Sequence, residues 1–177
     1  MLIKPRRGLA RAATDDSLME LLLACHERIR RFTAIAVALT DDGAATRAPA
    51  EIADGADAVR RYLALALPLH VADENESLLP RMVAHAPATT AALERMRDEH
   101  AQHERLIRDV ADRCAAIAAA PAELATLGPA LRAPALELQA ALALHLEEEE
   151  RDIFPAIPSL PGEVQSTIVA ELRARRT

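Results

Sequence analysis

Two eleven-residue stretches of the chain follow one pattern. Residues 70–80 read HVADENESLLP, and residues 145–155 read HLEEEERDIFP. Each stretch has a histidine, a glutamate four residues later, then a pair of apolar residues and a proline. Residues four apart share one face of a helix, so the histidine and the glutamate of each stretch can reach a single centre. These four residues are His70, Glu74, His145 and Glu149.

Another histidine precedes each stretch at nearly the same distance. His26 lies about 45 residues before His70, and His100 lies about 45 residues before His145. The chain therefore contains two copies of a helical hairpin, and we expect the copies to face each other. The local pattern His-Glu-Arg, which follows His26, occurs again at His103. Both His100 and His103 are thus candidates for the third helix, although the spacing favours His100.

The duplicated pattern favours a metal site over an ordinary charged surface. A single histidine–glutamate pair is common on a solvated helix face, and residues 147–150 taken alone have the pattern of such a face. Imidazole suits iron and zinc, and carboxylates can bridge two cations and offset their charge. Glu150 is rotated away from the face of Glu149 and is not expected to bind. The Glu-x-x-His pairs of ferritin-like proteins are not found on the required two helices.

Apolar residues at helical spacing predict four long helices and no strand. Pro68 is expected to kink the second helix, and residues 121–134, with three prolines, to form a loop with at most short helical pieces. Pro134 fits the first turn of the fourth helix. The sequence therefore predicts an all-α, up-down-up-down four-helix bundle with a short additional C-terminal helix. The expected ranges are about 18–39, 54–79, 91–119, 134–153 and 163–176.

Composition excludes several other classes of protein. Aromatic residues make up 2% of the chain and the net charge is -6, which argues against a nucleic-acid partner. No apolar run reaches the length of a membrane span. The two cysteines, Cys25 and Cys114, do not suggest a disulfide framework, so we expect buried thiols and a cytoplasmic protein. The basic first residues lack the apolar region of a secretory signal.

These residues resemble the hemerythrin-like family with its HHE cation-binding pattern, from about residue 18 to residue 155. The resemblance implies one domain over residues 14–177, after a basic arm of residues 1–13. It also implies a non-haem di-iron centre, with zinc or manganese as other metals, in which Glu74 and Glu149 bridge the ions. The implied metal ligands, with His103 as a further candidate, are His26, His70, Glu74, His100, His103, His145 and Glu149.

The chain departs from the family pattern in two places. Many relatives have a second histidine where this chain has Val71. On the third helix, oxygen carriers have two histidines four apart, whereas His100 and His103 are three apart. Either His103 is a fifth imidazole ligand, or a solvent molecule or carboxylate takes that place. Glu149 follows His145 by four residues, which is the spacing of bacterial and regulatory relatives.

The resemblance implies a protein that binds or senses oxygen, nitric oxide or iron. The alternative is a di-iron enzyme that repairs damaged iron centres or reduces a small oxidant. A metal-free helical interaction module is disfavoured by the duplicated histidines and glutamates. Multiple turnover with a reductant would separate the enzyme from the sensor, and stably bound iron would exclude the metal-free module. The sequence does not predict the oligomeric state.

Overall fold

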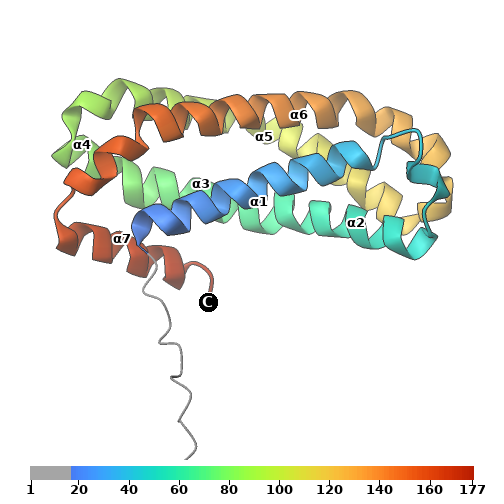
Figure 1. The fold of residues 1–177 in the computed structure, drawn as a ribbon, viewed down its shortest axis with the longest axis horizontal. Coiled ribbons are helices and arrows are strands. Elements are labelled where there is room, and N and C mark those ends of the chain that lie inside the picture. Colours follow the sequence, from blue (N-terminus) through green and yellow to red (C-terminus); the bar gives the residue numbers. More distant parts are fainter. Residues whose placement is uncertain (1–16) are drawn as a thin grey trace, which may run out of the picture.

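The computed structural model describes residues 17–177, which form a helical bundle without strands, as the sequence predicts. Four long helical segments lie side by side, and a shorter helix lies beside them at one end (Figure 1). The predicted basic arm, residues 1–13, lies outside the described residues. Short 3₁₀ turns join the segments at Ala44–Thr46, Pro87–Thr89, Pro121–Glu123 and Phe154–Ser159. The other elements are α1 (Leu18–Ala38), α2 (Pro49–Arg61), η2 (Tyr62–Ala66), α3 (Leu67–Ala72), η3 (Asp73–Leu78), α4 (Leu79–His85), α5 (Thr90–Ala119), α6 (Leu124–Asp152) and α7 (Gly162–Ala174).

The start of α1 is fixed by a capping box. Ser17 is the N-cap, and its hydroxyl accepts a hydrogen bond from the backbone N–H of Glu20. The Glu20 carboxylate in turn accepts from the Ser17 N–H at 2.7 Å. Such a cap satisfies two otherwise unpaired backbone donors and stabilises a helix by about 1 kcal/mol. It sets the register in which α1 presents its buried face.

The second segment begins earlier than predicted and contains two wide turns. It starts at Pro49 rather than near Asp54, because proline fits the first turn of a helix. The turns η2 and η3 are π-helical, and each is followed within two residues by a proline, Pro68 or Pro80. A widened turn relieves the clash between a proline ring and the preceding turn. The sequence predicted a kink at Pro68, and the structure has a π-helical turn just before this proline. The second such turn, η3, carries Glu74.

The loop predicted for residues 121–134 is wrong, because α6 begins at Leu124 and runs through Pro129 and Pro134. A proline inside a helix costs about 3 kcal/mol. Side chains in and just after this stretch offset the cost, since a fully buried leucine contributes about 1.5–3 kcal/mol. The buried residues are Leu124, Leu131, Ala135 and Leu138.

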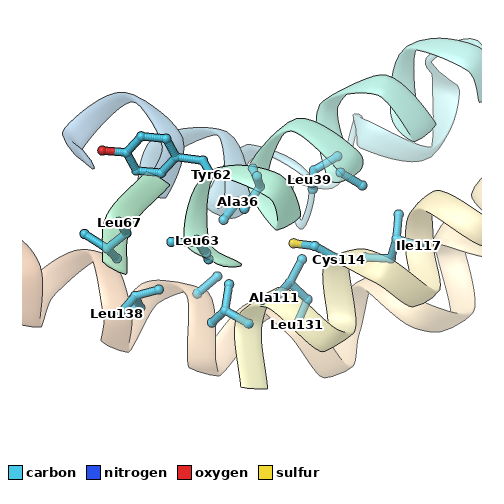
Figure 2. Packing of buried hydrophobic residues seen from close by; sticks show 14 of the residues in the cluster. Ala36, Leu39, Tyr62, Leu63, Leu67, Ala111, Cys114, Ile117, Leu131 and Leu138 are labelled. Atoms are coloured by element: carbon cyan, nitrogen blue, oxygen red, sulfur yellow. The ribbon is translucent and has the colours of Figure 1, made fainter. Parts of the chain in front are cut away.

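The hydrophobic core is divided into two clusters. One holds residues such as Leu63, Cys114 and Leu138, where α1, α2, α5 and α6 pack together (Figure 2). The other surrounds Leu78 and Phe154, where the start of α1, α4 and α7 meet. On α1, His26 lies where one cluster gives way to the other, and on α6, Glu149 lies at the same boundary. The buried histidines and glutamates of the core lie in this layer between two apolar regions.

The helix α7 packs against α1 and η3. Its Glu171 accepts hydrogen bonds from Ser77 and Arg81, each at 2.6 Å at the closest. Past its end, Arg175 donates to the fully buried Asp73 at 3.0 Å. These contacts hold the C-terminal residues against the π-helical turn that carries Glu74. No single helix among residues 17–177 is long and apolar enough to cross a membrane, although α5 and α6 with their flanking turns pass that test as a bent pair.

Candidate metal centre

Six of the seven predicted ligands converge in the polar layer of the core. They come from α1, α3, η3, α5 and α6, that is, from all four long segments. They form two groups of four, and within each group the ligand atoms lie within 4.8 Å of one another. Glu74 and Glu149 belong to both groups. The groups are His26, His70, Glu74 and Glu149, and Glu74, His100, His145 and Glu149.

In the first group, two imidazoles face the two carboxylates. His70 Nε2 lies 3.2 Å from Glu74 Oε1, and His26 Nε2 lies 3.1 Å from Glu149 Oε2. His26 Nε2 also lies 3.9 Å from Glu74 Oε1. All four side chains are buried. The i,i+4 pair of His70 and Glu74 therefore meets at one point, as its spacing predicts.

The second group uses the other oxygen of each carboxylate. His100 Nε2 lies 3.2 Å from Glu74 Oε2, and His145 Nε2 lies 3.1 Å from Glu149 Oε1. The Nε2 atoms of His100 and His145 are themselves 3.1 Å apart. Each glutamate thus presents one oxygen to each group, which is the arrangement of a carboxylate that bridges two cations.

The unpaired state of these atoms fits a pair of metal ions. All four carboxylate oxygens of Glu74 and Glu149, and Nε2 of His26 and His70, are buried without a hydrogen-bond partner among residues 17–177. An unsatisfied buried polar atom is costly, and an ionised one more so. Neighbouring ligands of an octahedral ion at about 2.1 Å lie about 3 Å apart. The observed separations match this spacing, and nitrogen and oxygen donors suit iron, zinc and manganese.

Three of the four histidines are oriented by an outer hydrogen bond. His26 donates through Nδ1 to Glu150 at 2.7 Å, and His145 donates through Nδ1 to Glu99 at 2.6 Å. Nδ1 of His100 lies 3.2 Å from the side-chain oxygen of Asn75. Arg30 also donates to Glu150, at 2.9 Å. Such contacts direct Nε2 inward and make it a better ligand.

These orienting residues escaped the sequence analysis. Glu150 was not expected to bind metal because it is rotated away from Glu149, and it belongs to neither group of ligands. It nevertheless reaches His26 on another helix. The only signals in the sequence were position, since Glu99 precedes His100 and Asn75 follows Glu74. Neither position could reveal the partner, because each contact joins different helices.

His103 lies beside the two groups rather than in them. Its ring centre is 5.6 Å from that of His145, and it lines a small cavity of about 20 Å³ together with His70, His100 and His145. Its Nδ1 is buried without a hydrogen-bond partner among the described residues. Burial and the neighbouring His145 lower the pKa of His103, so its ring is neutral near pH 7. The structure thus brings His100, rather than His103, to the carboxylates.

The buried carboxylates raise the pKa of the histidines beside them. Burial alone would lower the pKa of His26, but Glu149 and Glu74 raise it to about 10. Burial likewise opposes, and Glu149 and Glu99 cause, the rise in the pKa of His145 to about 9. Burial would raise the pKa of Glu74, yet the histidines hold it well below its usual range. Without metal, protons on the imidazoles supply the charge that cations would otherwise supply.

Comparison with known families agrees with this geometry. Residues 17–158 match the hemerythrin HHE cation binding domain. The match spans most of the chain, so the protein belongs to the hemerythrin family. A comparison with curated proteins gives no match. The helix α7 lies beyond the matched residues.

Proposed function

We propose that the protein holds a non-haem di-iron centre in an up-down-up-down four-helix bundle and uses it to bind or sense oxygen, nitric oxide or iron. The observation that carries the proposal is the sharing of Glu74 and Glu149 between the two groups of ligands. One buried carboxylate between two histidines would serve a single ion. Two carboxylates, each with one oxygen toward either pair of histidines, suit two ions.

The residues present could hold each ion with two imidazoles and two carboxylate oxygens. His26 and His70 would hold one ion, His100 and His145 the other, and Glu74 and Glu149 both. Four protein donors leave room for a further ligand on a metal that prefers six. Bound iron would supply a redox-active centre with affinity for a diatomic ligand.

The space beside the site favours a very small ligand. The cavity next to His70, His100 and His145 measures about 20 Å³, which is about the volume that one water molecule needs. Its remaining walls are mostly apolar, including Ile29 and Leu142. An apolar cavity of this size suits a diatomic molecule and excludes larger organic substrates. His103 lies at the same cavity, where it could contact a bound ligand.

The visible spectrum of the iron-loaded protein tests this proposal. The protein is reduced without air, its spectrum is recorded, and oxygen or nitric oxide is then added in stoichiometric amounts. A sensor or carrier should show a ligand-dependent change in absorbance that reverses when the gas is removed. Repeated consumption of an oxidant with added reductant would instead support the enzymatic alternative. A protein without iron-dependent absorbance would contradict both.

A further inference from the structure

A second and much larger cavity lies on the outer side of the metal centre. It measures about 500 Å³ and lies between α1, the η2–α3 stretch and α7. Its polar lining consists of Cys25, Arg28, Tyr62, His70 and two arginines of the C-terminal helix and tail. Since α7 lies outside the residues that match the family, this cavity is completed by a helix beyond the family domain. Its volume falls in the range of about 300–1,000 Å³ that small-molecule sites occupy.

The nitrogen of His70 that faces away from the carboxylates has no oxygen acceptor among residues 17–177. His70 is 3% exposed, and its Nδ1 has no well-aligned hydrogen-bond partner among the described residues, although the Cys25 thiol interacts with the ring. When Nε2 binds a metal, Nδ1 carries the proton of the ring and becomes a donor. The corresponding atoms of His26, His100 and His145 each have an oxygen partner. Of the four histidine ligands, His70 is therefore the one whose outer nitrogen has no oxygen partner in the described part of the chain.

The same cavity is positively charged. Arg28 makes no ion pair with a carboxylate among residues 17–177, and its hydrogen bond goes to Cys25 Sγ at 3.2 Å. Burial would raise the pKa of the Cys25 thiol, but His70 and Arg28 lower it to about 7. Arg176 also lines the cavity and pairs with Asp73, while Arg175 neutralises the same carboxylate from the other side. An arginine without a carboxylate partner is well suited to hold an oxyanion by two parallel hydrogen bonds.

We propose that this cavity binds a small organic carboxylate next to the metal centre. The carboxylate group would accept hydrogen bonds from His70 Nδ1 and Arg28. The hydrocarbon part would lie against the apolar walls, formed by Leu21, Leu69 and Leu172. The apolar walls favour an organic acid over inorganic phosphate. The donor role of His70 rests on the proposed metal at its Nε2, whereas the cavity and its arginines do not.

Such a ligand would tune the centre from outside. A carboxylate that accepts from the outer nitrogen of a metal-bound imidazole makes that imidazole a stronger ligand. The bound acid would thus change the iron spectrum without touching iron. It would also connect the state of α7, which walls the cavity, to the properties of the centre.

Titration calorimetry on the iron-loaded full chain tests the proposal, with octanoate, octanol and inorganic phosphate as probes. We expect octanoate to bind one molecule per chain and to shift the visible absorbance of the iron. Octanol and phosphate should bind at least about tenfold more weakly, because octanol lacks the carboxylate and phosphate lacks the hydrocarbon chain. Equal binding of octanol would refute the role of Arg28, and tighter binding of phosphate would refute an organic ligand. No octanoate binding at millimolar concentration would refute the site.

Two pairs of variants locate the site. Arg28→Gln should weaken octanoate binding by about tenfold, whereas Arg31→Gln, on the same helix but outside the cavity, should not. Ala66→Trp should block the cavity, whereas Ala64→Trp, also exposed on η2, should leave binding unchanged. Equal effects within either pair would overturn the assignment. If the protein proves to bind no iron, octanoate binding that still depends on Arg28 would support the cavity and count against the iron centre alone.

Discussion

The Nε2 atoms of His100 and His145 face each other at 3.1 Å in the core, although the two residues lie 45 positions apart in the sequence. Two imidazole nitrogens this close are poorly placed for each other unless a proton or a metal ion lies between them. Glu99 accepts from the outer nitrogen of His145, and Asn75 contacts that of His100, so both Nε2 atoms are directed inward. This pair defines one half of the candidate metal centre.

Replacing either shared carboxylate should empty part of the site. We expect Glu74→Ala and Glu149→Ala each to lose at least one of the two metals, because each glutamate supplies one oxygen to both groups. Glu147→Ala is the matched control, since Glu147 is exposed on the same helix as Glu149. Elemental analysis of the purified variants measures the loss. Full metal content in both ligand variants, or an equal loss in the control, would refute the bridging assignment.

The two histidines of α5 should differ in their effect. His100→Ala should lose iron, because His100 Nε2 lies 3.2 Å from Glu74. His103→Ala should keep iron but alter the spectrum of the complex with a diatomic ligand, because His103 lines the small cavity beside the centre. Iron content and absorbance of both variants make the comparison. An empty His103→Ala protein together with a loaded His100→Ala protein would reverse the assignment of the third-helix ligand.

The outer carboxylates should tune metal affinity without being ligands. Glu150→Gln and Glu99→Gln keep the shape of each side chain but weaken its hold on His26 or His145. Outer partners of this kind typically change metal affinity by about 10–100-fold. Competition with a chelator would measure the change, and Glu148→Gln on the same helix is a suitable control. Unchanged affinity in both variants would show that these contacts do not orient the imidazoles.

Metal binding should strengthen as the pH rises. The carboxylates raise the pKa of His26 from 6.5 to about 10 and that of His145 to about 9, so both rings are protonated near pH 7 in the metal-free protein. Each ring must lose a proton at Nε2 before it can bind, so affinity should increase between about pH 6 and pH 9 with release of protons. Chelator competition in buffers of different pH tests this, and a flat profile would contradict it.

The same shifts predict the stability of the metal-free protein. A histidine whose pKa is raised in the folded state stabilises the fold fully below its unfolded pKa, near 6.5, and loses that effect as the pH passes its folded pKa. The thermal unfolding midpoint of the metal-free protein should therefore fall as the pH rises from about 7 toward the values of 9 to 10 given by His145 and His26. A rising midpoint would mean that the rings are neutral in the folded state.

The sequence predicted the helical class and the convergence of the site because both depend on short spacings. His70 and Glu74 share a helix face, and the repeat required that the second copy, with Glu149, face the first. The prediction from sequence was wrong at the start of α6, where Pro129 and Pro134 lie inside a helix. Local propensity suggested a loop, and burial of the adjacent leucines in the core outweighed it.

The outer partners could not be predicted for a related reason. Glu150 on α6 contacts His26 on α1, and the rotation of α1 relative to α6 is fixed only by packing of the whole core. The π-helical turn η3 is likewise a product of tertiary structure, and it buries Asp73 next to the ligand Glu74. Helical spacing describes one helix at a time, whereas these contacts depend on the placement of two.

The metal content of the full chain is the most direct test of the central claim. The protein is expressed with ample iron, purified without chelators and analysed for iron, zinc and manganese per folded chain. Two shared carboxylates and four histidines predict about two metal ions per chain, with iron as the main metal. A well-folded protein that carries no metal, or one ion that survives in both Glu74→Ala and Glu149→Ala, would contradict the dinuclear centre.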